Sequence, residues 1–153
     1  MPKLSAGILL FRRRETGVEV LLVHPGGPFW KNKDNGAWSI PKGESAAGED
    51  PLSAARREFE EEIGFACSGG DPIPLGELKQ AGGKIVSAFA MEGDCAADSI
   101  RSNFFEIEWP PKSGKMQRFP EADRAGWFAL PQAREKVLAG QRAFLDRLAE
   151  LVR

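Results

Sequence analysis

Tyrosine is absent from the 153-residue sequence, so any aromatic contact to a ligand must come from phenylalanine or tryptophan. The only two cysteines, Cys67 and Cys95, lack the spacing of a metal site, and we expect them to be free thiols in a reducing compartment. The only histidine, His24, precedes Pro25 at the end of an apolar run. A single histidine in that position is expected to be structural rather than catalytic.

An excess of charge of one sign and long apolar runs are also missing. The net charge of −1 provides no global basic field for nucleic acid or for an anionic membrane. No run approaches the roughly 18 apolar residues of a membrane span. The first residues, MPKLSAGILLFRRR, place the apolar run before the arginines, which is the reverse of a secretory signal. The sequence therefore predicts a cytoplasmic protein. Nucleic acid is an unlikely partner, and no membrane partner is expected.

The length and composition predict a single domain over residues 1–153. A chain of 153 residues is the size of one domain with one core, and its hydrophobic content of 42% is ordinary for a globular protein. The sequence shows no internal repeat and no low-complexity segment. Nothing in the composition suggests a boundary between two domains.

Apolar and β-branched runs, separated by turns rich in glycine and proline, predict an α/β fold. The expected strands cover residues 4–12, 18–24, 38–42, 75–80, 84–91, 104–109 and 124–130. The expected helices cover residues 51–63 and 131–153, and Gly140 should break or kink the second one. The polar segments 93–103 and 110–120 are expected to be loops. Strands interspersed with two helices indicate a sheet that is covered on both faces.

The helix expected over residues 51–63 has clear ends and two different stripes. Asp50 suits the N-cap and Pro51 the first helical position, while Gly64 suits the left-handed residue after the last turn. At about 100° per residue, the apolar side chains fall on one stripe, which should pack into the core. The residues of that stripe are Leu52, Phe59 and Ile63.

The adjoining stripe carries Glu58, Glu61 and Glu62. Residues three and four apart are neighbours on a helix, so the three carboxylates repel one another by about 0.2–0.5 kcal/mol per pair. One interpretation is a solvated charged face. The other is a binding site for a hard divalent cation, because carboxylate oxygens suit Mg²⁺ or Mn²⁺. The acids alone do not decide between the two interpretations.

The residues around the acids form a longer pattern. It consists of a glycine, a glutamate, Arg-Glu, Glu-Glu, a second glycine and apolar residues at fixed intervals. This pattern resembles the complete signature of the Nudix hydrolases, and so many specified positions make a far more specific match than a lone glycine motif. The matching positions are Gly43, Glu49, Arg57, Glu58, Phe59, Glu61, Glu62, Gly64 and Phe65.

The resemblance implies a fold and a chemistry. The fold is an α/β/α sandwich with a central mixed β-sheet. The chemistry is Mg²⁺-dependent hydrolysis, by metal-activated water, of a diphosphate bond in a nucleoside diphosphate linked to another moiety; Mn²⁺ could replace Mg²⁺. The backbone carbonyl of Gly43 is implied to join Glu58, Glu61 and Glu62 around the metal. Glu49 and Arg57 are implied to form a structural ion pair that braces the loop against the helix.

The general base is left open by the sequence, because Nudix enzymes do not all use the same one. Glu58 is the first candidate and Glu121, in the loop before Trp127, is the second. Three further acids remain as alternatives: Glu106, Glu108 and Asp123.

Substrate contacts are predicted from two segments that precede the signature. In the Nudix family, a segment such as residues 38–42 commonly places aromatic and basic residues beside the substrate, which suggests Trp38 and Lys42. The loop of residues 25–36 contains Trp30 and Lys31, and it is either a solvated turn or a rim that stacks a base and attracts phosphate. The lysines at positions 31, 33, 42, 112 and 115 favour a highly charged small molecule, such as a dinucleoside polyphosphate or a nucleoside triphosphate.

Two alternatives to an enzyme acting on small nucleotides come from other functional classes. A nucleotide-sensing module would bind without hydrolysis, but it has little reason to keep the full set of acids. An RNA-decapping or RNA-binding protein is the other alternative, and the near-neutral charge weighs against it.

Overall fold

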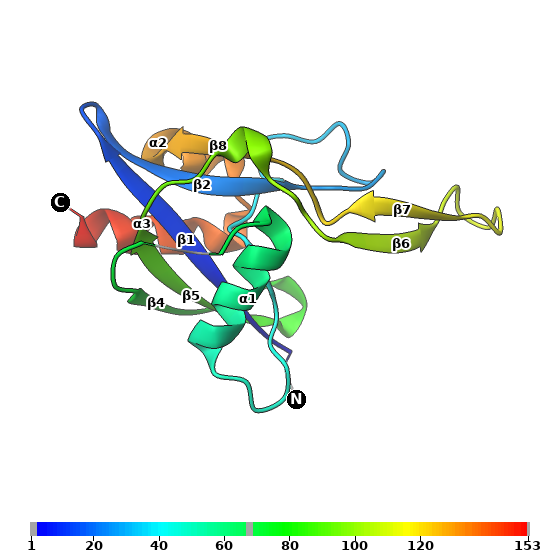
Figure 1. Ribbon diagram of the computed structural model, residues 1–153, viewed down its shortest axis with the longest axis horizontal. Helices are drawn as coiled ribbons and strands as arrows, with labels where there is room; N and C mark the ends of the chain where they lie inside the picture. Colours follow the sequence, from blue (N-terminus) through cyan, green and yellow to red (C-terminus); the bar gives the residue numbers. More distant parts are fainter. Residues whose placement is uncertain (1–2, 67–68, 153) are drawn as a thin grey trace.

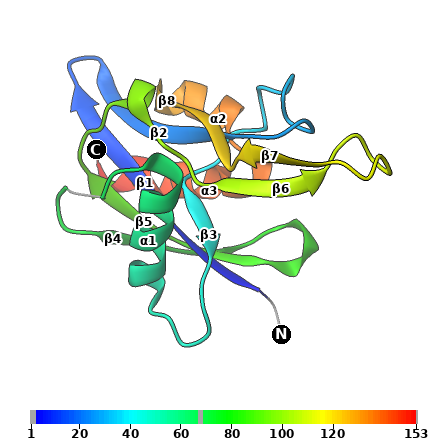
Figure 2. The ribbon, with the colours of Figure 1, turned by 45° about the vertical axis from the view of Figure 1, so that its right-hand side comes forward.

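A mixed sheet forms the centre of the computed structural model, which describes residues 3–66 and 69–152 (Figures 1 and 2). The main path of this sheet runs β4-β5-β1-β2-β8, and β3 pairs with β1 outside that path. Strand β1 is parallel to β5 and antiparallel to both β2 and β3. The strands of this sheet are β1 (Leu4–Arg14), β2 (Gly17–Pro25), β3 (Lys42–Glu44), β4 (Ile73–Lys79), β5 (Ile85–Glu92) and β8 (Ala122–Ala129).

Strand β1 is buried on both faces, which explains its continuous apolar run. Because successive side chains of a strand point to opposite faces, Ile8 and Leu10 pack on one side of the sheet and Leu9 and Phe11 on the other. Two hydrophobic clusters result, one on each face of the sheet. The expected sandwich with a mixed sheet is confirmed.

Helix α1 (Pro51–Ile63) covers one face of the sheet, and its ends lie at the expected residues. The side chain of Asp50 accepts a hydrogen bond from the backbone N–H of Ser53 at 3.1 Å. The helix ends at Gly64, whose φ of 89° is the left-handed conformation that glycine adopts without a steric cost. Phe59 and Ile63 are fully buried against the sheet, so the adjoining edge of the helix is free to present its acids.

The other face is covered by α2 (Leu130–Lys136) and α3 (Arg142–Leu151). The predicted break near Gly140 is present as a short 3-10 turn, η3 (Ala139–Gln141). Gln141 is buried there, and its side-chain oxygen accepts a hydrogen bond from the backbone N–H of Ile40 at 3.0 Å. No helix in the described part of the chain combines the length and the apolar character needed to cross a membrane.

The segment 38–42 was predicted as a strand, and this prediction is wrong. Trp38 and Ser39 form only isolated bridges, to Val137 and Val23, and the strand itself is β3, which begins at Lys42. The polar groups of this segment are satisfied by Gln141 and by β2 instead of by a regular ladder.

Residues 110–120 were predicted as a loop, but part of this segment is a strand. Strand β7 (Met116–Pro120) pairs with β6 (Phe104–Glu108) in a two-stranded sheet that projects from the body (Figures 1 and 2). Phe105 lies opposite Phe119, and such a cross-strand aromatic pair stabilises a hairpin that the basic and proline-rich sequence obscures. Two short 3-10 turns, η1 (Ala81–Gly83) and η2 (Ala97–Ser99), complete the described elements.

Cys95 has a free thiol, as predicted, and its side chain is half-buried. Cys67 lies outside the described residues.

Candidate functional site

A cavity of about 380 Å³, referred to below as the acidic cavity, opens between α1, β3 and the first residues of β1. Five glutamates and two lysines contribute to its wall, which makes it strongly polar. The residues that line it are Ser5, Lys42, Gly43, Glu44, Glu58, Glu61, Glu62, Lys84, Asn103 and Glu121.

Helix α1 supplies three of the five cavity glutamates. Glu58, Glu61 and Glu62 follow one edge of the helix, as the spacing of three and four residues predicts. The Glu58 side chain is 15% exposed and that of Glu61 is 41% exposed, so the acids line the cavity from its inside to its rim. The buried face of the same helix holds them in place, because Phe59 and Ile63 anchor it to the sheet.

Arg57 connects the helix to the loop between β3 and α1. Its guanidinium donates two hydrogen bonds to Glu49, both at 3.0 Å, in the forked geometry that matches a carboxylate. A third bond reaches the backbone oxygen of Glu44 at 3.1 Å. The same guanidinium also donates to Glu58 at 2.8 Å and lies 3.4 Å from Glu61. Arg57 therefore both braces the loop and neutralises part of the acidic edge.

Gly43 lies against the carboxylate of Glu58 so closely that no larger residue fits. A Cβ atom at this position would overlap the two oxygens and the carboxyl carbon of Glu58. Gly43 is held in this place by β3, where it pairs with Ala6 of β1. The glycine therefore keeps a space open between the strand and the acidic edge of the helix.

Glu62 is the most unusual of the five glutamates. One of its carboxylate oxygens, Oε2, is buried without a hydrogen-bond partner. Burial raises the pKa of Glu62 to about 8, although the nearby charge of Lys42 acts in the opposite direction. Burial also raises the pKa of Glu58, against the effect of its bond to Arg57. Burying an acid without a partner destabilises the fold, and such acids are found mainly at functional sites.

The remaining wall of the cavity comes from distant parts of the sequence. Lys42 precedes Gly43 in β3, and burial together with the charge of Lys84 lowers the pKa of Lys42. Glu121 enters from the turn before β8, where its backbone N–H bonds to the oxygen of Asn103 at 2.8 Å. Lys84 precedes β5, and the sequence analysis did not identify it.

The comparison with protein families agrees with this geometry. The family model of the NUDIX domain matches residues 1–148. The chain belongs to the Nudix family. Two curated relatives also match. One is the octanoyltransferase of Myxococcus xanthus, 28% identical over 136 residues, which cover 89% of this chain and 33% of that protein. The other is the RNA pyrophosphohydrolase of Rhodospirillum rubrum, 44% identical over 66 residues, which cover 41% of this chain and 38% of that protein.

The chain thus spans about a third of the length of the curated relatives it matches. Among solved structures, a C. elegans Ap4A hydrolase in a binary complex superposes with a TM-score of 0.70, 20% sequence identity and 96% coverage of both chains. At this identity the similarity establishes the shared Nudix fold.

The residues of the Nudix acidic cavity fit a divalent cation in two respects. The orphaned Oε2 of Glu62 is a buried acceptor without a donor, and Gly43 leaves room where a side chain would fill the space beside Glu58. Carboxylate oxygens are the ligands that Mg²⁺ and Mn²⁺ prefer. Within residues 3–66 and 69–152, no three acidic, histidine or cysteine side chains converge into a preassembled metal centre. Arg57 helps to keep these side chains apart, because it holds one oxygen of Glu58.

The raised pKa of Glu62 predicts an unusual pH dependence of stability for the metal-free Nudix protein. Between the ordinary value of 4.5 and the folded value of about 8, the folded state keeps a proton that the unfolded state has released. The free energy of unfolding therefore falls as the pH rises through this window. In EDTA, the Tm of the wild type should fall between about pH 5 and about pH 8. The Tm of Glu62→Gln should fall less over the same range, by several degrees.

Thermal unfolding followed by circular dichroism over this pH range measures the effect. Glu60→Gln is the matched control, since Glu60 is exposed on the same helix and does not line the cavity. Its Tm should follow that of the wild type at every pH. Equal pH profiles for Glu62→Gln and the wild type would show that Glu62 is ionised in the folded protein.

The aromatic substrate contacts predicted from the sequence are not brought to the Nudix acidic cavity. Trp38 is 5% exposed and belongs to the core, where its ring packs edge-on against His24 and Phe128. Its indole N–H donates to Asp34 at 2.8 Å. The prediction that Trp38 contacts the substrate is wrong, because neither face of its ring is free to stack a base.

Trp30 and Lys31 lie in the loop after β2, away from the acids. Lys31 lines a separate hollow of about 530 Å³ beside the β6–β7 hairpin, together with Trp109 and Phe119. Trp30 is half-buried and lines neither this hollow nor the acidic cavity. Of the four predicted substrate contacts, only Lys42 reaches the acidic cavity.

The geometry narrows the candidates for the general base. Glu108 accepts hydrogen bonds from the backbone N–H groups of Lys112 and Gly114, so it organises the turn of the hairpin. Asp123 bonds to His24 at 2.9 Å, and the other nitrogen of His24 bonds to the oxygen of Lys33 at 2.6 Å, which gives the histidine a structural environment. Glu106 lies on the hairpin and does not line the acidic cavity. Glu58 and Glu121 do line it.

Proposed function

We propose that the protein is a divalent-cation-dependent pyrophosphohydrolase that cleaves a diphosphate bond in a nucleoside diphosphate linked to another moiety. One observation carries the proposal: acids suited to a cation and lysines suited to phosphate line one cavity beside a glycine that keeps it open. These residues are Gly43, Glu58, Glu61, Glu62, Glu121, Lys42 and Lys84. Membership of the Nudix family, and the names of the RNA pyrophosphohydrolase and the Ap4A hydrolase it resembles, support the same class of reaction.

The proposed roles follow from the charge of the substrate. The anionic oxygens of a diphosphate repel a nucleophile, so hydrolysis requires cations around it. Glu58, Glu61 and Glu62 would hold Mg²⁺ or Mn²⁺ with the backbone carbonyl of Gly43. The bound cation would neutralise phosphate charge and lower the pKa of a coordinated water. Lys42, within the wall of the cavity, would contact a phosphate oxygen directly.

Glu121 and Glu58 are the two candidates for the base that removes the proton from the attacking water. Burial raises the pKa of Glu58, which makes it a stronger base, but its bond to Arg57 occupies one oxygen. Glu121 is exposed and lines the cavity from the turn before β8. The base is the residue whose replacement by glutamine removes the acidic limb of the pH–rate profile, since that limb reports its protonation.

The activity is tested by incubating the protein with ADP-ribose, ATP and diadenosine tetraphosphate and measuring phosphate-containing products by chromatography. With Mg²⁺ or Mn²⁺ present, we expect turnover of at least one substrate. EDTA should abolish that turnover, and excess Mg²⁺ should restore it, because the acids by themselves cannot neutralise a phosphate. Turnover that survives EDTA would contradict the proposed role of the acids. Binding of a nucleotide with no turnover would identify a sensing module instead.

A further inference from the structure

The segment of residues 101–103 connects the end of α1 to the turn before β8. The last carbonyl groups of an α-helix have no partner within the helix, and this segment supplies donors for two of them. The backbone N–H of Arg101 donates to the oxygen of Ile63 at 2.8 Å. The backbone N–H of Asn103 donates to the oxygen of Glu61 at 2.9 Å. The segment is therefore fixed to the helical turn that carries the cavity acids.

Gly64 permits this close approach. A Cβ atom at Gly64 would lie 2.6 Å from the Cβ of Arg101 and 2.8 Å from its backbone oxygen, so any larger residue would push the segment away from the helix. The second glycine of the Nudix signature thus has two effects. It ends α1 in the left-handed conformation, and it leaves room for residues 101–103 beside the helix.

The same segment holds the turn before β8 through a chain of three hydrogen bonds, referred to below as the Ser102 clamp. The hydroxyl of Ser102 accepts a bond from the backbone N–H of Ala122 at 2.9 Å. It also donates to the backbone oxygen of Asn103 at 2.9 Å. That oxygen accepts a second bond, from the backbone N–H of Glu121, at 2.8 Å. Bonds in such a chain polarise one another, which strengthens the hold on the turn.

The ladder of the main sheet does not fix this turn by itself. The register of β8 with β2 shifts between His24 and Pro25, which leaves Asp123 without a partner in the ladder. A bulge of this kind interrupts pairing and changes the direction of nearby side chains. Beyond the bulge, the backbone N–H of Gly26 donates to the oxygen of Glu121 at 3.0 Å. The position of Glu121 therefore depends on this bond and on the Ser102 clamp.

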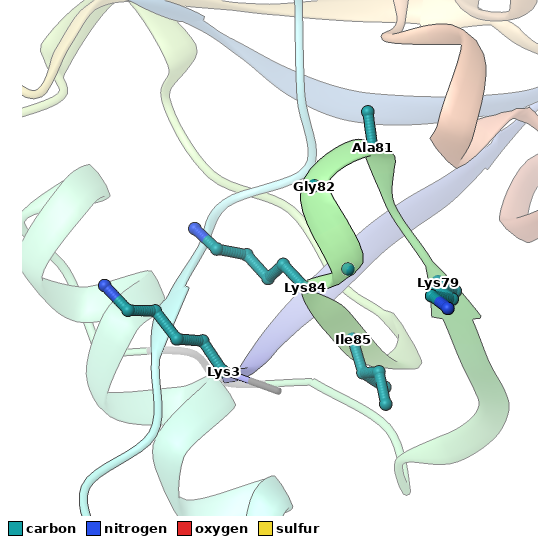
Figure 3. Close-up of a pocket in the computed structure, with 7 residues that line it drawn as sticks. Lys3, Lys79, Ala81, Gly82, Lys84 and Ile85 are labelled. Atoms are coloured by element: carbon teal, nitrogen blue, oxygen red, sulfur yellow. The ribbon is translucent and has the colours of Figure 1, made fainter. Parts of the chain in front are cut away.

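Lys84, which also lines the acidic cavity, is held in a different way. Its side chain extends beside that of Lys3, toward β3 and α1 (Figure 3). Across residues 3–66 and 69–152, no hydrogen bond or ion pair holds the ammonium group of Lys84. The fold thus leaves this lysine free to follow a ligand, whereas it fixes the backbone that carries Glu121.

We propose that Ser102 is a positioning residue, which holds Glu121 in the acidic cavity at a fixed place relative to the acids of α1. This inference rests on the proposed function, and it assigns to Glu121 the removal of the proton from the attacking water. Glu58, the other candidate base, has one oxygen held by Arg57. Within the described ranges, no protein donor bonds the carboxylate of Glu121. Ser102 does not line the cavity, so it acts only through the turn that it holds.

Ser102→Ala tests the inference by kinetics, with whichever of ADP-ribose, ATP and diadenosine tetraphosphate the wild type hydrolyses. The variant removes the hydroxyl of the clamp and no group that lines the cavity. Because a displacement of about 1 Å can cost about 100-fold in rate, we expect kcat to fall about tenfold or more. KM should stay within about twofold, since the binding residues are untouched.

Ser102→Thr keeps the hydroxyl and should restore function. Its kcat should remain at least about half of the wild-type value, because threonine can accept and donate the same bonds. A kcat as low as that of Ser102→Ala would show that the hydroxyl is not what holds the turn, and it would overturn the inference.

A double-mutant cycle with Glu121→Gln separates positioning from a general loss of structure. Glu121→Gln alone should lower kcat by about 100-fold or more, as expected for the loss of a positioned base. If Ser102 acts through Glu121, adding Ser102→Ala to this variant should lower kcat by less than about twofold further. Equal losses in the two backgrounds, or wild-type kcat in Glu121→Gln, would overturn the inference and leave the proposed function intact.

Ser113→Ala is the matched control. The hydroxyl of Ser113 also accepts a bond from a backbone N–H, that of Lys115 at 3.2 Å, but it lies in the exposed turn of the β6–β7 hairpin and outside the cavity. Its kcat should remain within about twofold of the wild type, since surface substitutions of this kind have small effects.

Amide hydrogen exchange followed by NMR measures the Ser102 clamp without any enzymatic activity. In Ser102→Ala, the amide of Ala122 should exchange about tenfold faster than in the wild type, because its acceptor is lost, while the amides of α1 keep their rates. If the wild type hydrolyses none of the three substrates but this change is seen, the proposed function fails and the clamp stands. If the amide of Ala122 exchanges at the same rate in both proteins, the inference fails.

Discussion

Replacing Glu62 with glutamine should lower kcat/KM by at least about 100-fold, because residues that only support a metal ligand already cost 10–100-fold when replaced. Glutamine keeps the size of the side chain but removes the charge that a cation needs. No protein donor satisfies the Oε2 of Glu62. Replacing this oxygen should therefore weaken cation binding rather than destabilise the fold. Steady-state kinetics over a range of Mg²⁺ concentrations would show the loss and whether excess Mg²⁺ partly restores the rate.

The variant Glu60→Gln again serves as the control. It removes the same charge from the same helix, but from an exposed position outside the cavity. We expect its kcat/KM to remain within about twofold of the wild type, since an exposed charge on the surface is largely screened. Wild-type activity in Glu62→Gln, with an unchanged circular dichroism spectrum, would refute the metal-binding role of Glu62.

Gly43→Ala should reduce kcat/KM by about 10–100-fold through displacement of Glu58. The added Cβ would overlap the carboxylate of Glu58, so either β3 or the end of that side chain must move. Active-site groups lose much of their effect when they are displaced by about 1 Å. Isothermal titration calorimetry with Mn²⁺ should show weaker binding in this variant, while the Tm should change by only a few degrees.

Gly70→Ala offers a comparison in which the same atom is added without a clash. The nearest atoms to a Cβ at Gly70 belong to Glu92 and lie 3.8 Å away, which is ordinary van der Waals contact. This variant should keep both activity and Mn²⁺ binding. If Gly43→Ala retained full activity, the space beside Glu58 would have no functional importance.

The sequence predicted those parts of the site that depend on local geometry. Helix α1 has its expected ends because Asp50 caps it and Gly64 adopts the left-handed conformation. Its acids share one edge because an α-helix has a fixed periodicity, which needs no tertiary information. The contact between Arg57 and Glu49 spans only one loop, so a family pattern was sufficient to anticipate it.

The sequence could not predict what depends on pairing between distant segments. Lys84 reaches the acidic cavity only because β5 lies parallel to β1, and no local pattern around Lys84 indicates that arrangement. Trp38 was predicted at the site from its position before the signature, but burial against His24 and Phe128 takes it into the core. Strand β7 was missed because the prolines and basic residues of the segment 110–120 are typical of a loop, while the pairing of β7 with β6 is determined by the hairpin as a whole.

The pairing of β1 with β5 also has a practical consequence for handling the protein. Because the backbone of Lys3 is bonded to Ile85, any peptide fused ahead of residue 3 would emerge near the start of β1, where Ser5 lines the acidic cavity. A polyhistidine tag fused there would bring imidazoles, which bind transition metals, close to the acidic cavity. Affinity tags are therefore better attached after α3, which covers the opposite face of the sheet (Figure 1).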